Sequence, residues 1–526
     1  MTARRHATTF VWILAVGAIV GGVGCASRDR RTPDDTVVMV IEAPMTTADP
    51  RFALSNYDAK LAKLIAPGLT SVDTPDALPR LELARAIDRI DDTTYDVTLG
   101  DARFSDGQPV TATDVARTYE SVMDPSCGSL HEKNFRERFT SVEAIDPSRV
   151  RFHLALPLAT FVTDIEFGVI SYHGVPAGEC RPPRVLGAGP YQLAELTSRH
   201  VVLDANPYAT PHARTPHVEI RFVPDDAART LMLVGGSADL LQNAARPDLV
   251  DDIALRPRVT VQAAPSVLLT YMLLNNDDPA LRDVRVRQAI ALALDRPAII
   301  AAKFGGRAVL ATGLLPPASW AYEPDVVRYD RDLPRARALL DAAGLPPGPG
   351  GVRLHLTYKT SAVAFRVAIA RLLAQQLADV GIEVELRPFE FATLFADVKR
   401  GSYQIASMQS PEITEPDFYR WFFHSNGIPD ARNPDGSNRW RYRNADIDAW
   451  TEAARRQLDR DARKALYARI QRKIAEDVPI VPLWHEDNVV LANRDVHGYT
   501  IVPNARFIGL AGVTKGDPAP QAAQGR

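Results

Sequence analysis

One carboxylate stands out in the sequence because prolines fix its surroundings. In the stretch QSPEITEPDFY, Gln409 to Tyr419, Glu412 follows Pro411 directly and Pro416 comes four residues later. Proline blocks a continuing helix or a central strand, so we expect Glu412 on a loop that is restrained at both ends. A carboxylate held in this way loses little conformational freedom when it binds a cation. The alternative is an ordinary solvated loop charge.

No motif of a common catalytic or metal site is present. GxSxG, which carries the nucleophile of many hydrolases, is absent, and neither His-Glu pair, at 131–132 and 485–486, continues into HExxH. Cys127 and Cys180 lack the CxxC spacing and the nearby histidines of a zinc site. We therefore expect a protein that is not an enzyme and has no cofactor and no metal, with a secreted hydrolase as the competing hypothesis.

The composition is that of an ordinary globular protein. The 526 residues carry a net charge of -3, and 46% of them are hydrophobic and 24% charged. The chain shows no basic stripe, so we expect no nucleic-acid partner. At about 100–200 residues per domain, two to four domains are expected.

The N-terminus predicts export. Two arginines precede an apolar stretch from Phe10 to Val23, which is too short and too rich in glycine for a comfortable membrane span. Its end, GVGC, resembles a bacterial lipobox with Cys25 as the lipidated residue, although Gly22 stands where leucine is usual. Ordinary signal cleavage nearby is the alternative. We expect a signal peptide over 1–25 and a lipid anchor in the periplasm or cell envelope.

Two cysteines remain in the mature chain, Cys127 and Cys180. Both flank loops, DPSCGS and AGECRPP, and an oxidising compartment permits them to pair. We predict a disulfide between them, and two small buried apolar side chains are the alternative.

Helical and strand patterns alternate along the chain after a polar linker over 26–36. Examples are the alternating strand pattern of TTYDVTLG and the helix pattern of TATDVARTYESVMD. In GAGPY, at 187–191, two glycines give a turn its backbone freedom. The alternation predicts α/β layers, and the composition after residue 512 predicts a disordered tail over 513–526.

The order of six motifs resembles that of the solute-binding proteins of peptide-type ABC importers, a family that binds oligopeptides, dipeptides and nickel complexes. The motifs are FSDGQPVTATDV, GAGPY, LLNN with LRDVRVRQAIALALDR, RARALLDAAG, LAQQLADVGIEVEL and VPIVPLW. The resemblance implies an α/β, two-lobed periplasmic-binding-protein fold with three domains, in which hinge motion closes the lobes over a ligand. Mapped onto this chain, the discontinuous domain I covers 37–73, 185–270 and 485–512. Domain II is inserted at 74–184, and domain III covers 271–484.

The resemblance also implies a role for Glu412. Related dipeptide- and oligopeptide-binding proteins carry an aspartate at this place in the loop, and it pairs with the α-ammonium group of the peptide. They have tryptophan three residues earlier, where this chain has Gln409, so one stacking wall of the pocket is lost. Glutamate also reaches about one methylene further than aspartate. The ligand amine then sits differently, or the ligand is not a standard peptide.

Two further stretches hold candidate ligand contacts. Tyr271 and Asn275 lie in TYMLLNN, where the chain is expected to cross between the lobes, and they are placed to bind the ligand backbone. Asn438, Arg439 and Tyr442 lie in DGSNRWRY, and the guanidinium is suited to holding a ligand carboxylate by two hydrogen bonds. Core packing and turn formation explain the same residues, so both interpretations stay open.

These features predict the extracytoplasmic component of an ABC importer. Its expected partners are a short peptide or peptide-like ligand with a free amino group and a membrane permease, and the protein itself is expected to be a monomer. Besides the hydrolase, the alternative is a lipoprotein of this fold that binds a metal chelate, haem or a murein peptide.

Overall fold

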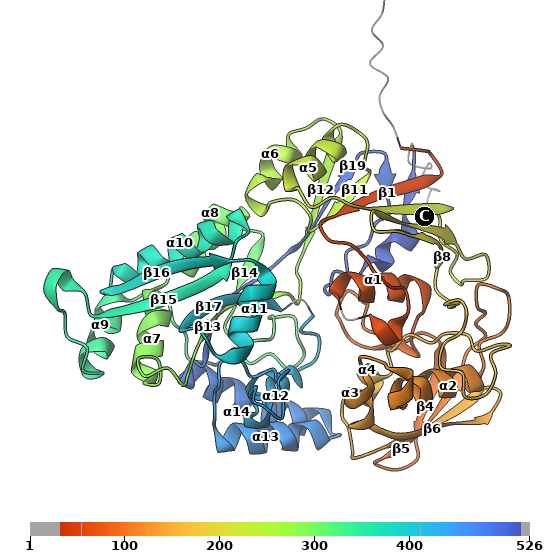
Figure 1. Cartoon of the computed structure of the whole chain (residues 1–526), viewed down its shortest axis with the longest axis horizontal. Helices are drawn as coiled ribbons and strands as arrows, with labels where there is room; N and C mark the ends of the chain where they lie inside the picture. Colours follow the sequence, from red (N-terminus) through yellow and green to blue (C-terminus); the bar gives the residue numbers. More distant parts are fainter. Residues whose placement is uncertain (1–31, 54, 411, 517–526) are drawn as a thin grey trace, which may run out of the picture.

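The computed structural model describes residues 32–53, 55–410 and 412–516. The signal peptide with Cys25 and most of the linker lie outside the described residues. None of the described helices is long and apolar enough to cross a membrane. Two lobes are visible, one built on two sheets and the other on a third sheet (Figure 1).

The first lobe contains a seven-stranded mixed sheet. Its strands come from three separate parts of the chain, and β1 lies near the centre, parallel to both of its neighbours. In spatial order they are β12 (Val259–Ala264), β19 (Asn488–Asn493), β11 (Leu240–Gln242), β1 (Thr36–Ile41), β10 (His217–Phe222), β9 (His200–Ala205) and β8 (Tyr191–Leu196). This sheet is therefore complete only when β19, near the C-terminal end of the described residues, has joined it.

An antiparallel four-stranded sheet forms the other part of the first lobe. Its order is β4 (Ala84–Arg89), β5 (Thr94–Leu99), β7 (Arg149–Leu154) and β6 (Phe139–Asp146). Helix α2 (Ala112–Met123) packs on it. Helix α2 begins at a capping box in which Thr111 and Asp114 satisfy each other's backbone amides.

The second lobe is built on a six-stranded mixed sheet. Its order is β14 (Ala308–Leu310), β18 (Ile480–Glu486), β13 (Leu269–Leu274), β17 (Ile405–Ser410), β15 (Leu354–Ser361) and β16 (Ile382–Phe389). The helices of this lobe are α7 (Val284–Ala293), α8 (Arg296–Phe304), α9 (Leu333–Ala342), α10 (Ala364–Ala378), α11 (Phe391–Arg400), α12 (Phe418–Phe423), α13 (Ala445–Arg456) and α14 (Arg460–Asp477). Helix α10 packs on β15 and β16, and α13 packs on α14.

Two short segments connect the lobes. Residues 265–268 run from β12 to β13, and Asp487 alone joins β18 to β19. The first crossing therefore precedes TYMLLNN, because β13 lies wholly in the second lobe, whereas the return falls in VPLWHED. The crossings are joined by a hydrogen bond from the hydroxyl of Ser266 to the carbonyl of Glu486.

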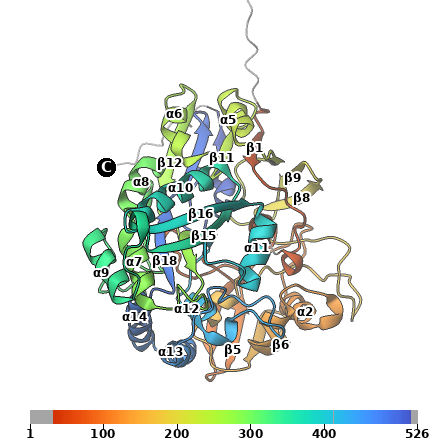
Figure 2. The ribbon, with the colours of Figure 1, turned by 60° about the vertical axis from the view of Figure 1, so that its left-hand side comes forward.

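The lobes also touch away from these crossings. The guanidinium of Arg307 in the second lobe pairs with Asp251 at 2.8 Å, and the amide of Ala159 donates to the carbonyl of Arg455 at 3.0 Å. Helix α13 and the four-stranded sheet accordingly lie side by side in both views (Figure 1 and Figure 2). The structure is thus a closed arrangement of the two lobes.

The remaining elements complete the first lobe. The helices are α1 (Asn56–Ile65), α3 (Glu132–Arg136), α4 (Phe161–Asp164), α5 (Asp226–Val234) and α6 (Val250–Ala254), and the short strands are β2 (Thr70–Ser71), β3 (Arg80–Leu81), β20 (Val496–His497) and β21 (Thr514–Lys515). Strand β21 pairs with β20, and the ammonium of Lys515 binds Asp239 at 3.0 Å. Ordered structure thus continues past residue 512, where the sequence predicts the tail to begin.

The glycines of GAGPY serve close packing. The amide of Gly189 donates to the carbonyl of Ile65, and a Cβ on Gly187 would lie only 1.9 Å from that carbonyl oxygen. Neither glycine has the positive φ that favours glycine, so backbone freedom is not the reason for them. They hold the C-terminal end of α1 in place, and α1 forms a wall of the cleft described below.

A disulfide joins Cys127 to Cys180, with Cα atoms 5.3 Å apart. It connects the end of the α2 region to a loop that also supplies the Cys180 carbonyl to the buried guanidinium of Arg51. Asp124 lies close enough to the two sulfurs to resemble a metal-ligand set, but sulfurs bonded to each other are not thiolate ligands.

Replacing both cysteines, Cys127→Ala with Cys180→Ala, should lower the free energy of unfolding by about 4 kcal/mol, because the bond closes a loop across 53 residues. Urea denaturation measures this loss. A reductant should destabilise the wild type to the same degree and leave the double variant unchanged. Two alkylatable thiols at these positions in unreduced, unfolded protein would contradict the prediction.

Candidate functional site

A cavity of about 690 Å³ lies between the lobes. Helix α1 and the 131–138 and 160–168 segments form its wall in the first lobe, and residues 412–421 form its wall in the second. A volume of this size is within the range of about 300–1,000 Å³ that holds small-molecule ligands. Both lobes would thus enclose a bound solute.

The lining of this cavity is acidic. Five carboxylates line it, against three permanent cations, so the wall has a net charge of about -2 when every group is ionised. The carboxylates are Asp164, Glu166, Glu412, Glu415 and Asp417, and the cations are Lys63, Arg138 and Arg506. This imbalance favours a ligand with a positive charge.

Arg506 joins the parts of the site. Its guanidinium lies 3.2 Å from Asp73, 3.0 Å from Glu166 and 3.1 Å from Glu412, so it connects the first lobe to the loop of the second. Burial opposes its charged form, but Glu166, Glu412 and Asp73 outweigh burial and hold the pKa of Arg506 well above its usual range. Arg506 could not be found from the sequence, because NARFIGL contains no recognisable motif.

Glu412 is the central residue of the second lobe's wall. It lies on the loop 412–417 between β17 and α12, as the prolines predict, and its Oε2 accepts the hydrogen bond from Arg506. Its Oε1 is buried and has no hydrogen-bond partner among the described residues. One carboxylate oxygen of this cavity-lining residue therefore lacks a donor, which is costly unless a donor arrives.

Lys60 of α1 is, after Arg506, a second cation whose charge interacts with Glu412. It is buried, and its ammonium lies 4.7 Å from the ring centre of Phe507 and 5.2 Å from that of Tyr57. Burial lowers the pKa of Lys60 to about 8, although Glu412 and Glu42 act in the opposite direction. The charge on Glu412 is thus balanced partly from the first lobe.

Aromatic side chains form the apolar part of the cavity. Phe135 and Phe167 face it from the first lobe, and Phe418 and Trp421 face it from α12. The structure leaves 44% of Trp421 exposed, while Tyr419, Phe422 and Phe423 of the same helix are buried. The helical period of α12 turns Trp421 away from the core.

Arg439 stacks behind Trp421. Its guanidinium lies 5.6 Å from the Trp421 ring centre and 4.7 Å from that of Phe395. In the described part of the chain no ion pair joins Arg439 to a carboxylate, and its Nε is buried without a partner. Burial lowers the pKa of Arg439, which shows how poorly this cation is compensated.

Gln409 and two other candidates support the sheet of the second lobe. Gln409 donates to the hydroxyl of Thr270 on the neighbouring strand. Tyr271 is 2% exposed and packs against Phe422 and Trp440. The side-chain amide of Asn275 donates to the carbonyls of Gly401 and Tyr403, just before β17. None of the three lines the cavity. Tyr271 and Asn275 take part in core packing and turn formation, and their ligand contacts stay predictions.

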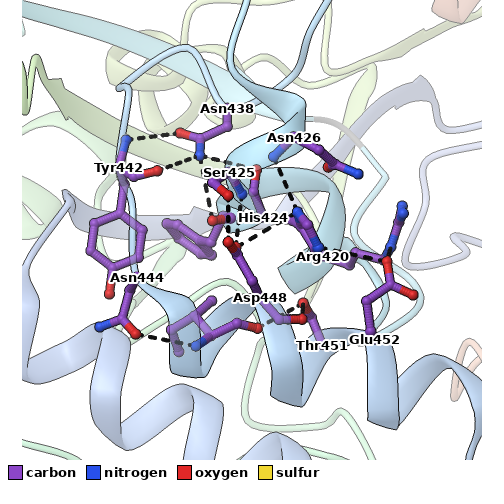
Figure 3. Close-up of polar contacts among 12 residues, drawn as sticks. Arg420, His424, Ser425, Asn426, Asn438, Tyr442, Asn444, Asp448, Thr451 and Glu452 are labelled. Atoms are coloured by element: carbon purple, nitrogen blue, oxygen red, sulfur yellow. Dashed lines mark hydrogen bonds and ion pairs between the residues drawn. The ribbon is translucent and has the colours of Figure 1, made fainter.

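Asn438 and Tyr442 also have structural roles. The Asn438 side chain is fully buried, donates to the carbonyls of His424 and Tyr442, and accepts from the amide of Tyr442 (Figure 3). The hydroxyl of Tyr442 donates to Asp477 at 2.6 Å. The side-chain polar groups of Asn438 and Tyr442 are already satisfied, so these two residues shape the loop that carries Arg439.

Three carboxylates meet where the lobes close. Asp164 of the first lobe faces Glu415 and Asp417 of the second, and Arg463 lies 3.3 Å from Glu415. Burial raises the pKa of Asp164. Burial also raises the pKa of Glu415 to about 7, and the neighbouring acids add to this effect. Closure thus places like charges together in a poorly solvated space.

Comparison with known proteins agrees with this architecture. The model of the bacterial extracellular solute-binding proteins, family 5 (middle region), matches residues 79–430. The glutathione-binding protein GsiB of Shigella dysenteriae is 26% identical over 96% of this chain and 98% of its own. The probable D,D-dipeptide-binding periplasmic protein DdpA of Escherichia coli is 26% identical over 90% and 92%.

A solved structure shows the same fold. The ABC transporter substrate-binding protein CtaP from Listeria monocytogenes superimposes with a TM-score of 0.81 at 26% identity, over 91% of this chain and 99% of CtaP. The predicted two-lobed periplasmic-binding-protein fold is thereby confirmed.

The chain belongs to family 5 of the bacterial extracellular solute-binding proteins. It is a binding protein of an ABC importer and not an enzyme, and proteins of this family act outside the cytoplasm.

The raised pKa of Glu415 predicts a pH dependence of stability. A carboxyl group with a folded-state pKa of about 7 and an ordinary value of 4.5 binds more protons in the folded state between these values. The contribution of this group to the free energy of unfolding is therefore fully present below pH 4.5 and is lost as the pH rises through 7. Glu415→Gln should be more stable than the wild type at pH 8 and nearly equal to it at pH 4.5.

Urea unfolding at the two pH values measures this difference. Glu323→Gln is the matched control, because Glu323 pairs with Arg472 at 2.9 Å and does not line the cavity. A Gln variant at 415 that is less stable than the wild type at pH 8 would mean that the ion pair with Arg463 outweighs the burial of Glu415.

Proposed function

We propose that this protein captures a short peptide, or a peptide-like solute with a free amino group, between its lobes and delivers it to an ABC permease. The observation that carries the proposal is the unsatisfied Oε1 of Glu412 on an acidic cleft wall. An ammonium group placed there gains a charge-assisted hydrogen bond, worth about 1.5–3 kcal/mol. GsiB and DdpA, named for binding glutathione and a D,D-dipeptide, support a peptide-like ligand.

The two ends of such a ligand have different partners. We assign the ammonium group to Glu412, with Arg506 as the residue that holds the carboxylate in position through Oε2. We assign the carboxylate of the ligand to Arg439, which stacks behind the lining residue Trp421 without lining the cavity itself, because this cation has no carboxylate partner of its own in the described chain. The aromatic wall of Phe418 and Trp421 then accepts side chains of the ligand.

The domain division and the state of the mature protein belong to the same proposal. The seven-stranded sheet, the four-stranded sheet and the six-stranded sheet support a discontinuous domain, an inserted domain and a third domain. We propose a monomer that is anchored to the membrane through lipidated Cys25, which lies in the part of the chain outside the described residues.

Glu412→Gln should weaken the binding of an amino-terminal peptide by about 30-fold to several thousand-fold, because removing one member of an enclosed charge pair costs about 2–5 kcal/mol. N-acetylation of the peptide should harm binding to the wild type comparably. It should have little further effect on the Gln variant, since the two changes remove the same contact. Calorimetry with the tightest binder from a panel of di- and tripeptides, glutathione included, measures all four affinities.

Glu166→Gln is the matched control for this cycle. It takes one carboxylate from Arg506, as Glu412→Gln does, but acetylation should still weaken binding to this variant. Independent effects of acetylation and Glu412→Gln would place the amine elsewhere. If no peptide of the panel binds, the ligand is not a peptide.

Cys25→Ser should leave the signal uncleaved or release the protein in soluble form, because the lipid cannot be attached to serine. Membrane fractionation and the mass of the mature N-terminus measure this outcome. Unchanged processing and unchanged fractionation would show that Cys25 is not the anchor.

A further inference from the structure

Lys60 is a buried cation that lacks an acceptor. The residue is 5% exposed, and in the described part of the chain its ammonium makes neither a hydrogen bond nor an ion pair with a carboxylate. It packs instead against two aromatic rings, with centres at 4.7 Å for Phe507 and 5.2 Å for Tyr57. An ammonium group has three N–H donors, and a ring face satisfies them less well than an oxygen does. A charge buried in this way is costly unless an acceptor arrives.

The position of Lys60 places it beside the meeting point of the lobes. It belongs to α1, which forms part of the cavity wall in the first lobe. Phe507, against which its ammonium packs, directly follows Arg506, and Arg506 holds Glu412 of the second lobe at 3.1 Å. The nitrogen of Lys60 is not fully covered even in this closed arrangement, and opening of the lobes exposes it further. A solute that enters the cleft can therefore reach it.

Two carboxylates near Lys60 are incompletely satisfied as well. Glu42 follows β1 directly, and its Oε2 is buried without a hydrogen-bond partner among the described residues, as is Oε1 of Glu412. Burial opposes the charge of Lys60 and both carboxylates favour it, although neither forms an ion pair with it. An unpaired cation and two carboxylates that each lack a donor thus share one region without contacting one another.

These groups fit a ligand that carries both charges close together. A ligand ammonium supplies the donor that Glu412 lacks, and a ligand carboxylate supplies a charged acceptor for Lys60. An amino group and a carboxylate on the same carbon atom, as in the head of a free amino acid, meet this condition. The N-terminal residue of an ordinary peptide does not, because the carboxyl group next to its amine is a neutral amide.

We propose that Lys60 selects ligands whose free amino group shares its carbon atom with a carboxylate, as in a γ-glutamyl peptide. The ligand ammonium binds Glu412, a step that rests on the proposed function, and the adjacent carboxylate binds Lys60. An α-linked peptide offers Lys60 only an amide carbonyl, which is a weaker acceptor than a carboxylate. Lys60 is thus a specificity-determining residue of the amine site.

Two isomeric dipeptides, γ-Glu-Gly and α-Glu-Gly, test this selection, because they have the same atoms and charges and differ in where the amine and carboxylate are joined. Calorimetry with the wild-type protein should show γ-Glu-Gly binding at least about tenfold more tightly, the effect of one charge-assisted contact. Amidation of the α-carboxylate of γ-Glu-Gly should remove most of this advantage. Equal affinities of the two isomers, or an amidated ligand that binds as tightly as γ-Glu-Gly, would overturn the role of Lys60.

Lys60→Met tests the residue itself, because methionine keeps an unbranched stem and removes the charge. The variant should bind γ-Glu-Gly at least about tenfold more weakly than the wild type does and α-Glu-Gly almost unchanged. Amidation should have little further effect on it, since both changes remove the same contact. A variant that loses both isomers equally would show a structural role and overturn the proposal. The amidation test in the wild type decides the question if Lys60→Met does not fold.

Lys63→Met is the matched control on the same helix, because Lys63 has a partner of its own, Glu82 at 2.6 Å. This variant should keep the preference for γ-Glu-Gly over α-Glu-Gly, and loss of the preference here would overturn the assignment to Lys60.

The outcomes also separate this inference from amine capture. Peptides that bind through Glu412 without a preference for the γ isomer would overturn the role of Lys60 and leave the proposed function in place. The same conclusion would follow if a peptide of the panel binds and neither isomer does. Absence of binding by the isomers and by the whole panel would overturn both.

Discussion

The ion pairs of the Arg506 guanidinium are the interaction on which this architecture depends. A buried cation is expensive, and Arg506 is stabilised only because three carboxylates from distant parts of the chain converge on it. Asp73 precedes the four-stranded sheet of the first lobe in the chain, Glu166 follows it, and Glu412 belongs to the second lobe. One side chain therefore fixes the first lobe internally and couples it to the second.

The same interaction leaves a surplus of negative charge. Arg506 neutralises one of its three carboxylates, and the cleft around it has further acids with few cations. Closing the lobes buries these charges beside one another, and burial, with Asp417 and Asp164 adding to it, raises the pKa of Glu415. A ligand that brings an ammonium group into the cleft relieves this repulsion, so closure and ligand binding favour each other. This coupling is the physical basis expected of a protein that closes on its solute.

The sequence by itself determined the alternation of helices and strands, the family resemblance and the loop of Glu412, because periodicity and proline act locally. Tertiary structure decided which polar residues reach the cleft. Asn438 and Tyr271 have the same residue types as ligand contacts, but core packing and main-chain carbonyls occupy them. Arg506 carries no local signal, since its importance comes from carboxylates up to 433 positions away in the chain. Convergence of that kind is set by the folded chain as a whole and is invisible in any single stretch.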